Sequence, residues 1–433
     1  MKRDIVRVGL LGMGTVGTGV MRILDDNAEN ITRKIGCPLR IEKILVRDLS
    51  KTRRLSVDSA LFTTDVADIL DNPNIDIVVE LMGGERPAKE YILEAMRKGK
   101  HVVTANKDVV AKYGKELFET AEKYHIDLLF EASVGGGIPI IRPLKQCLAA
   151  NKIQEIIGIV NGTTNYMLTK MSQEGCDFDS VLKEAQAKGY AESDPTADVG
   201  GLDAARKIAI LASIAFGTRV SVDDVYVEGI TNITPEDIAY AKELGFVIKL
   251  LGIAKEVNGE VEVRVHPAFI PQTHPLAAVN DVFNAIFVKG DAVGEAMFYG
   301  RGAGEMPTAS AVTADVIDVA RDIVHGVSSR ILCTCFVTKP IRSMEEVPSS
   351  FYIRLLALDR PGVLAVIAGA FGSHGVSLQS VIQKRKVNSD AEVVLVTNAV
   401  AEKNMRNALR MIELGDVVRE IGSVIRVEGG NLE

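Results

Sequence analysis

Short apolar runs, separated by amphipathic stretches, dominate the pattern of the first 137 residues. Five of these runs have the length of buried strands, at residues 5–11, 41–46, 75–81, 101–104 and 126–130. Segments 88–98 and 113–124, which lie between the later runs, have the spacing of helices. Because strands and helices alternate, we predict a mostly parallel, doubly wound α/β sheet in this part of the chain.

The pattern changes after this first domain, which we assign to residues 1–137. Residues 138–304 mix helical and strand-like stretches, which indicates a second domain of α+β type. A helical stretch within residues 305–335 is expected to pack back on the first domain. Residues 336–350 include proline, serine and charged positions that are typical of a linker.

Residues 351–433 have a rhythm of their own. Strand-like and helical stretches follow in the order βαββαβ, at residues 352–358, 363–371, 376–383, 391–397, 402–414 and 417–427. This order predicts a ferredoxin-like third domain.

The composition, with 47% hydrophobic and 25% charged residues, is that of an ordinary soluble protein. A net charge of −7 gives no general attraction to nucleic acid or to an anionic membrane, so neither is expected as a partner. Two uncharged stretches, 8–21 and 361–383, are interrupted by glycines and are not expected to be membrane segments. Five scattered cysteines are typical of reduced thiols, which favours a cytoplasmic location. Cys333 and Cys335 lack a second pair with which to bind zinc.

A glycine-rich turn, Gly12-Met13-Gly14-Thr15-Val16-Gly17, follows the first apolar run. The G-x-G-x-x-G spacing between a strand and a helix is typical of a dinucleotide-binding turn. Gly12 would allow the tight turn, Gly14 would let the backbone approach a pyrophosphate, and Gly17 would let the helix pack on the strand. Thr15 and Val16 begin the helix, whose N-terminus would face the phosphates.

The end of the second apolar run bears on the choice between NADP and NAD. Arg47 could bind the 2′-phosphate of NADP, whereas Asp48 could accept hydrogen bonds from the ribose hydroxyls of NAD. We favour NADP on the charge of Arg47, with NAD as the alternative. Arg47 could equally be a solvated strand end.

A carboxylate-rich loop, residues 189–201, runs into a helical stretch with two charged residues near its start. Asp203 and Lys207 are four residues apart, so both side chains project from one face of the helix. A lysine fixed beside a carboxylate can hold an amino-acid substrate and transfer its proton. The alternative is an ordinary surface ion pair worth roughly 0.3 kcal/mol.

Several motifs occur in an order and spacing that are highly specific when taken together, at residues 12–17, 102–107, 130–139, 158–165, 190–198, 201–207 and 300–308. Through these motifs, the chain resembles the homoserine dehydrogenase family of the single-function type with a C-terminal ACT domain. The resemblance extends over essentially the whole chain. The resemblance implies a Rossmann-like cofactor domain, an α+β catalytic and dimerisation domain, and a ferredoxin-like ACT domain. It implies the reversible, NAD(P)-dependent interconversion of L-homoserine and L-aspartate 4-semialdehyde, in threonine and methionine biosynthesis.

The resemblance also implies roles for individual residues. The catalytic acid/base would be Lys207, and Lys107 would be a second active-site lysine that also meets the cofactor. Asp203 and Glu192 would bind the substrate, with Gly189 beside them. Without the resemblance, Lys107 would be interpreted as a solvated strand end.

Two glycine-rich loops carry further implied roles. The second glycine loop would meet the cofactor at Gly304. A structural sodium ion would be bound by one side chain and neighbouring carbonyls, at Glu131, Val134, Gly136 and Ile138.

The turn at residues 359–362 resembles the ACT signature, which implies that a small amino acid binds near Asp359 and Gly362. Threonine is the expected effector, and the domains are expected to pair between subunits of a homodimer or homotetramer. The alternative is a domain that only holds subunits together. For the whole chain, two other functions stay open: a catalytically inactive amino-acid-sensing protein, and a dehydrogenase that acts on aspartate.

Overall fold

The computed structural model describes residues 4–331, 333–387 and 390–429. Contacts divide the chain into two compact units. Unit 1 comprises residues 1–156, 209–223 and 284–339, and unit 2 comprises residues 157–208, 224–283 and 340–433. Among the described residues, no helix has both the length and the apolar character needed to cross a lipid bilayer.

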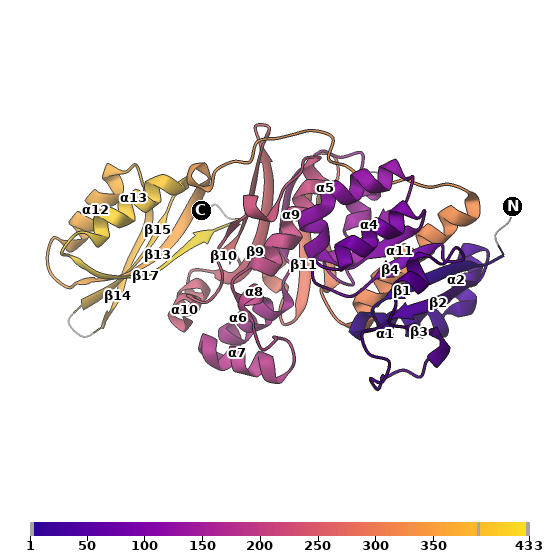
Figure 1. Cartoon of the computed structure of the whole chain (residues 1–433). Helices are drawn as coiled ribbons and strands as arrows, with labels where there is room; N and C mark the ends of the chain where they lie inside the picture. The colour runs from indigo at the N-terminus through magenta and orange to yellow at the C-terminus, as the bar shows by residue number, and fades with distance from the viewer. Residues whose placement is uncertain (1–3, 332, 388–389, 430–433) are drawn as a thin grey trace. The chain divides into compact units, whose positions relative to one another are not determined.

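A six-stranded parallel sheet forms the centre of unit 1 (Figure 1). Its strands are β1 (Val6–Leu11), β2 (Leu39–Leu45), β3 (Phe62–Thr63), β4 (Ile77–Glu80), β5 (His101–Thr104) and β6 (Leu128–Leu129). They lie in the order β3-β2-β1-β4-β5-β6, which is the order of a Rossmann-like fold. The strand order reverses between β1 and β4, so their carboxyl ends border the place where such folds bind ligands.

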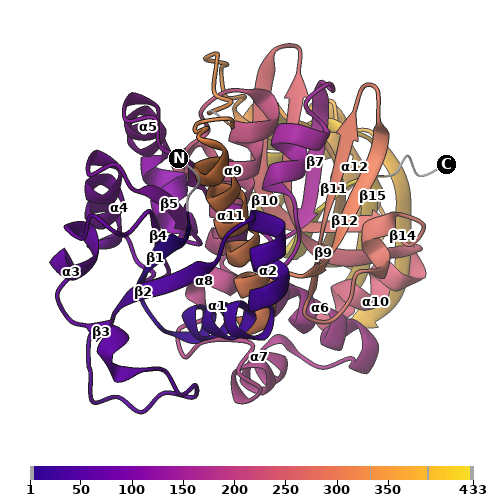
Figure 2. The same cartoon turned by 90° about the vertical axis from the view of Figure 1, so that its right-hand side faces the viewer.

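Helices cover both faces of this sheet (Figure 2). One face carries α1 (Thr15–Asp26), α2 (Ala28–Ile35) and α11 (Glu305–His325), and the other carries α3 (Ala67–Leu70), α4 (Ala88–Arg97) and α5 (Lys107–Lys123). Side chains of β4 alternate between the two layers, because Ile77 and Val79 pack in the first and Val78 in the second. The prediction of a doubly wound sheet is therefore confirmed.

Close packing brings α11 against α1 on the first of these faces. A Cβ atom added to Gly19 of α1 would lie 2.8 Å from the Cβ atom of Ala309 in α11. Unit 1 also contains β12 (Gly294–Arg301) and, from Asn284 on, β11 (Phe283–Gly290). The division between the units also falls within β7 (Ile153–Ile159) and α9 (Leu202–Phe216).

Unit 2 begins with helices and a long hairpin. The helices are α6 (Gly162–Glu174), α7 (Phe178–Ala187), α8 (Thr196–Val199) and α10 (Pro235–Glu243), and the strands are β8 (Tyr226–Val227), β9 (Phe246–Val257) and β10 (Glu260–Pro271). Strands β9 and β10 pair antiparallel along their whole length. Asn258 and Gly259 join them with positive φ angles of 54° and 85°, as in the tight turns that match strand twist.

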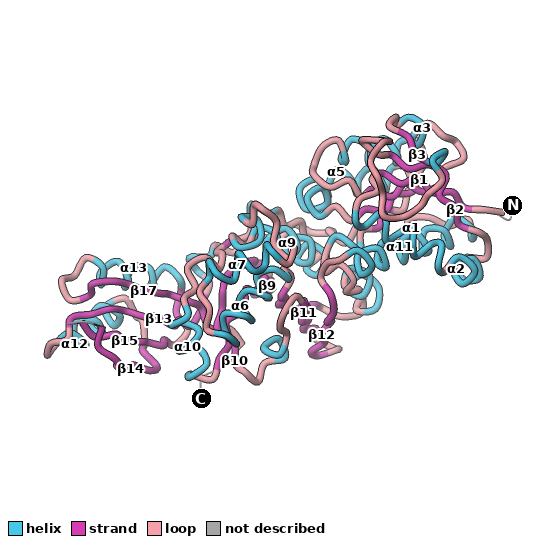
Figure 3. The backbone as a smooth tube through the Cα atoms, turned by 90° about the horizontal axis from the view of Figure 1, so that it is seen from below, coloured by secondary structure: helices cyan, strands magenta, loops and turns pink. Residues whose placement is uncertain are grey.

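The C-terminal part of unit 2 has the predicted βαββαβ order. Its elements are β13 (Pro348–Leu358), α12 (Val363–Ser373), β14 (Leu378–Val387), β15 (Asp390–Thr397), β16 (Val400–Ala401), α13 (Glu402–Glu413) and β17 (Val418–Val427). The long strands lie in the order β17-β13-β15-β14 (Figure 3), which confirms a ferredoxin-like domain. Strand β13 starts four residues before its predicted position, because Pro348 and Ser349 pair with β16.

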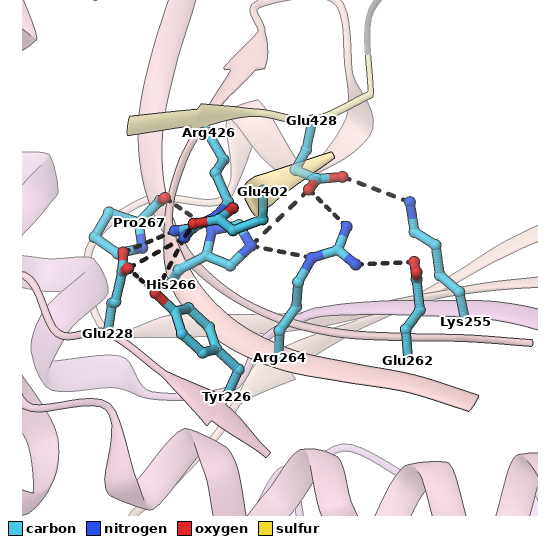
Figure 4. A network of polar contacts seen from close by, with 10 residues as sticks. All are labelled: Tyr226, Glu228, Lys255, Glu262, Arg264, His266, Pro267, Glu402, Arg426 and Glu428. Atoms are coloured by element: carbon cyan, nitrogen blue, oxygen red, sulfur yellow. Dashed lines mark hydrogen bonds and ion pairs between the residues drawn. The ribbon is translucent and has the colours of Figure 1, made fainter. Parts of the chain in front are cut away.

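Strand β17 continues the hairpin sheet by pairing in parallel with β10, so that Ala268 is opposite Arg426. Beside this pairing lies a cluster of buried and half-buried polar side chains (Figure 4), here called the junction network: Tyr226, Glu228, Lys255, Glu262, Arg264, His266, Glu402, Arg426 and Glu428. In one half, Arg426 binds Glu228 at 2.8 Å and Glu402 at 2.7 Å. In the other half, Arg264 binds Glu262 and Glu428, both at 2.8 Å.

His266 lies completely buried in the second half of the junction network. Its Nε2 atom accepts a hydrogen bond from the Arg264 guanidinium at 3.1 Å, so the proton belongs on Nδ1, which lies 2.9 Å from the carbonyl oxygen of Pro267. Burial, together with the charges of Arg426 and Arg264, lowers the pKa of His266 from 6.5 to about 3.

This buried histidine should make the protein less stable in mild acid. Below pH 6.5 the unfolded chain protonates His266, whereas the folded chain does so only near pH 3, so the free energy of unfolding falls through this window as pH falls. The expected slope from this group is about 1.4 kcal/mol per pH unit. Urea unfolding measures this effect. Between pH 6.5 and about pH 5, the free energy of unfolding should fall less for His266→Gln than for the natural chain. The exposed His325 supplies the control, because His325→Gln should leave the loss unchanged. An equal loss in all three chains would contradict the assignment.

Candidate active site

Asp203 and Lys207 form a buried ion pair at the start of α9, in unit 2. The Nζ atom of Lys207 lies 2.6 Å from Oδ2 of Asp203 and 2.7 Å from the carbonyl oxygen of Val160. The Lys207 and Asp203 side chains are only 12% and 11% exposed, so the pair is not the solvated surface pair that the sequence left open. An ammonium group has three N–H donors, and two of them have acceptors here. The third can point to a ligand.

Asn161 holds this pair in place, and its role was missed in the sequence. It is the N-cap of α6, where its side-chain oxygen accepts a hydrogen bond from the backbone N–H of Thr164 at 2.9 Å. Its amide nitrogen donates to Asp203 at 2.9 Å and to Asp198 at 2.7 Å. An asparagine followed by Gly-Thr-Thr is a typical helix start, so the cap could have been predicted, whereas its two carboxylate partners could not.

A third carboxylate, Glu192, belongs to the same group of acidic residues. Burial raises the pKa of Asp198, the Asn161 amide lowers it, and the negative charges of Asp203 and Glu192 raise it further. Carboxylates gathered around one lysine suit a substrate that carries an ammonium group. Asp198 was not among the predicted site residues, although it lies in a quoted motif.

The loop that carries Glu192 is anchored to the neighbouring helices. Gly189 turns the chain out of α7 with a left-handed φ of 74°, which favours glycine. Thr163 donates to the carbonyl oxygen of Tyr190 at 2.6 Å, and Gln186 donates to that of Glu192 at 3.1 Å. Because the backbone is held at both points, the exposed Glu192 side chain projects from a fixed loop.

The glycine turn of unit 1 has the geometry expected for dinucleotide binding. Gly12 has a φ of +99°, and a Cβ atom on Gly17 would lie 2.5 Å from the Gly12 carbonyl oxygen. A Cβ atom on Gly14 would have no neighbour within 4 Å, which leaves room for a pyrophosphate. Helix α1 begins directly after it, at Thr15 and Val16, with no side-chain cap, so its first N–H groups are available to an anion.

Arg47 and Asp48 follow the carboxyl end of β2, and both are exposed. The Asp48 carboxylate accepts hydrogen bonds from the hydroxyl and the backbone N–H of Ser50, at 2.7 and 2.8 Å. These bonds lower the pKa of Asp48. Asp48 therefore orders its own loop, and Arg47 is the better placed of the two to meet a ligand.

Lys107 is the first residue of α5, directly after the carboxyl end of β5. Asn106 caps this helix, and its backbone N–H is bound by the Thr104 hydroxyl at 3.0 Å. The same hydroxyl donates to the fully buried Glu80 at 2.7 Å, at the end of β4. Burial raises the pKa of Glu80. Sequence reasoning missed Glu80 and Thr104, although a glutamate that ends an apolar strand is an unusual feature.

The Glu131 side chain assigned to the predicted sodium site is bound by backbone donors. Both oxygens of the Glu131 carboxylate accept hydrogen bonds from backbone N–H groups of residues 140–142, at 2.5 to 2.8 Å. The side chains of Val134 and Ile138 are apolar and buried, and Gly136 has none, so these three positions offer an ion only their backbone carbonyls, as predicted. Within the described part of the chain, no cluster of three or more His, Cys, Asp or Glu residues could hold a metal.

Gly304 lies at the start of α11, where it forms the N-cap with a φ of 129°. This helix, like α1, has no side-chain cap. The loop before it packs tightly, since a Cβ atom on Gly136 would lie 2.3 Å from the carbonyl oxygen of Gly302. Unit 1 therefore contains two adjacent helices, α1 and α11, that both begin with uncapped N–H groups after a glycine turn.

Known proteins match this chain over its whole length. Three protein-family models match the chain. The model of the homoserine dehydrogenase family matches residues 139–317, that of the homoserine dehydrogenase NAD-binding domain matches residues 12–131, and that of the ACT domain matches residues 351–412. A homoserine dehydrogenase of Synechocystis is 49% identical over 98% of this chain and 99% of its own length. One of Bacillus subtilis is 45% identical over 98% of both chains.

The chain belongs to the homoserine dehydrogenase family. Solved structures agree, since a homoserine dehydrogenase from Thiobacillus denitrificans has a TM-score of 0.92 at 45% identity and covers 98% of both chains. A hyperthermophilic archaeal homoserine dehydrogenase in complex with NADPH has a TM-score of 0.62 at 27% identity, over 73% of this chain. The protein is thus an NAD(P)-dependent oxidoreductase, as the resemblance of its motifs implied.

The ACT domain of the chain has the predicted turn. Gly362 is the N-cap of α12 with a φ of 90°, and the helix has no side-chain cap. Asp359 binds Lys386 of β14 at 2.5 Å. An uncapped helix start beside a carboxylate offers partners for the two charged groups of a free amino acid. The presence of the ACT domain is consistent with regulation of the enzyme.

Proposed function

We propose that Lys207 is the proton donor and acceptor of the homoserine dehydrogenase reaction, and that Asp203 and Glu192 bind the ammonium group of its substrate. The observation that carries this proposal is the buried pair of Asp203 and Lys207, in which one N–H of Lys207 is left for a substrate oxygen.

The bound nicotinamide supplies or accepts the hydride. As negative charge grows on the aldehyde oxygen of L-aspartate 4-semialdehyde, Lys207 donates a hydrogen bond and then a proton to it. In the reverse direction Lys207 takes the hydroxyl proton of L-homoserine. Lys107 supplies a second positive charge that stabilises the same oxygen.

One spectrophotometric assay separates this function from its alternatives. The purified chain should oxidise NADPH when L-aspartate 4-semialdehyde is added, and should not reduce NADP⁺ when L-aspartate is added. Turnover with aspartate would favour an aspartate dehydrogenase. An absence of turnover with either substrate would favour an inactive amino-acid-sensing protein.

We also propose that NADP is preferred over NAD, through Arg47. The engagement of Asp48 with Ser50 supports this proposal, as does the NADPH bound to the archaeal relative. Arg47→Ala should raise the KM for NADPH by about tenfold or more, since an arginine–phosphate contact is worth roughly 1.5–3 kcal/mol. The KM for NADH should stay unchanged. Arg40, exposed near the opposite end of β2, is the control, and Arg40→Ala should alter neither value. A parallel rise in both KM values after Arg47→Ala would remove Arg47 from 2′-phosphate recognition.

Threonine is the effector that we propose for the ACT turn, which would place the enzyme under control of the threonine branch of threonine and methionine biosynthesis. Asp359→Ala should raise the threonine concentration for half-inhibition by about tenfold or more, because an ion pair to the effector ammonium is lost. Activity without threonine should not change. The exposed Asp416 provides a matched control in Asp416→Ala. An absence of calorimetric heat and of inhibition with threonine in the natural chain would exclude this effector.

A homodimer or homotetramer is proposed for the assembled enzyme. Support comes from β12, which is the edge strand of its sheet and could pair with another subunit. Its apolar side chains Met297 and Tyr299 are 42% and 54% exposed. Light scattering of the purified chain would give the number of subunits.

We also propose the predicted domains, at residues 1–137 with 305–335, 138–304 and 351–433.

A further inference from the structure

A second group of reactive side chains lies in unit 1. It lines a narrow pocket whose wall includes two aromatic rings, two cations and two thiols: Phe118, Phe130, Lys145, Arg219, Cys333 and Cys335. The two cysteines are neither fully buried nor fully exposed, so a small molecule can reach them. No part of the proposed reaction uses these residues.

The two cations of the pocket have aromatic rather than carboxylate neighbours. Lys145 Nζ lies 5.4 Å from the ring centre of Phe118 and 5.5 Å from that of Phe130, and the Arg219 guanidinium lies 5.7 Å from Phe118. Across the described ranges, neither cation forms an ion pair with an aspartate or glutamate. Burial lowers the pKa of Lys145. The pocket thus places two cationic side chains beside the two thiols, although the Glu131 carboxylate also acts on Lys145.

Cys333 is the group best placed to balance that charge. The Arg219 Nη2 atom donates to Sγ of Cys333 at 3.5 Å. A hydrogen bond from the Cys335 thiol, the Cys335 backbone N–H and the charges of Arg219 and Lys145 lower the pKa of Cys333 to about 5, although burial opposes them. The neighbouring Cys333 raises the pKa of Cys335, which therefore keeps its proton. A thiolate beside a protonated thiol is the arrangement found in reactive dithiols.

We propose that Cys333 and Cys335 form a redox-active dithiol that reduces hydroperoxides. In the first step the Cys333 thiolate attacks one peroxide oxygen, the O–O bond breaks, and hydroxide leaves and is protonated to water. Cys333 becomes a sulfenic acid, so sulfur is oxidised and the peroxide is reduced. In the second step the Cys335 sulfur attacks Cys333, the S–O bond breaks, and a second water leaves with the Cys335 proton. The product is a disulfide between the two residues.

Chain geometry allows this bond. Two extended residues span at most roughly 7 Å, and disulfides join Cα atoms at separations of about 4.4–6.8 Å. The backbone is bent here, because Phe336 donates its N–H to the carbonyl oxygen of Thr334 at 3.0 Å. The Cys-x-Cys spacing alone did not predict a reactive dithiol, because the two cations beside it, Lys145 and Arg219, come from distant positions in the sequence.

Thiol reactivity in the full-length chain tests the proposal. At about pH 6, iodoacetamide should label Cys333 at least roughly tenfold faster than the exposed Cys147, because Arg219 and Lys145 favour the thiolate of Cys333. Arg219→Gln should reduce this advantage. Equal labelling of Cys333 and Cys147 in the natural chain would overturn the proposal. This comparison does not depend on the folding of any variant.

Hydrogen peroxide supplies the second readout, with mass spectrometry of the peptide that contains both cysteines. In the natural chain this peptide should lose two hydrogen atoms, and the loss should be reversed by a dithiol reductant. In Cys335→Ser the same peptide should instead gain one oxygen on Cys333. Oxidation that appears first on Cys147 or Cys176, with residues 333–335 unchanged, would refute the dithiol.

Discussion

Lys207→Ala should lower kcat for L-homoserine oxidation by about a hundredfold or more while NADP⁺ still binds. The variant removes the ammonium group that lies 2.6 Å from Asp203 and that has one N–H donor beyond its bonds to Asp203 and Val160. Developing charge on the substrate oxygen then loses its proton donor, which is an effect on the transition state rather than on ground-state binding. Initial rates of NADPH formation, with cofactor binding followed by fluorescence, measure both quantities.

A matched control separates chemistry from general loss of charge. Lys183 is exposed on α7, so Lys183→Ala should keep kcat within about twofold of the natural value. Added methylammonium should restore part of the activity of Lys207→Ala, because a small amine can occupy the space of the lost side chain. Turnover near the natural rate in Lys207→Ala would remove this lysine from the reaction.

Arg426→Met should cause the largest loss of stability, about 3–5 kcal/mol in the free energy of unfolding. The Arg426 side chain is 4% exposed and neutralises Glu402, which is 5% exposed, and Glu228. Without Arg426 the Glu402 charge stays buried without its main partner, and its desolvation is no longer offset. Urea unfolding near neutral pH measures the change.

Two further variants show whether the junction network is the cause. Arg419 is exposed on the same strand, so Arg419→Met should change the free energy of unfolding by less than about 0.5 kcal/mol. Adding Glu402→Gln to Arg426→Met should recover part of the loss, because the buried charge is then gone. A loss in Arg426→Met no greater than that in Arg419→Met would show that the network contributes little.

Local sequence patterns predicted the glycine turn well. The roles of Gly12, Gly14 and Gly17 depend on a strand, a turn and a helix that are consecutive in the chain, so spacing alone defines them. The pair of Asp203 and Lys207 was predicted for the same reason, because both lie on one helix.

Features that join distant parts of the chain could not be predicted. The partners of Arg426 come from positions 228 and 402. Glu402 reaches Arg426 within the C-terminal domain, and Glu228 reaches it where β17 pairs with β10. The resemblance to the family implied a sodium ion at Glu131, and a carboxylate with neighbouring carbonyls suits such a hard cation. The fold turns this carboxylate toward three backbone N–H groups, which a sequence motif does not reveal.

A crystal structure with L-homoserine and the oxidised cofactor bound would test the central claim most directly. We expect the hydroxyl oxygen of homoserine within hydrogen-bond distance of Lys207 Nζ, and its ammonium group against the carboxylates of Asp203 and Glu192. A complex in which the hydroxyl oxygen lies away from Lys207, with Lys207 still bound only to Asp203 and Val160, would contradict it.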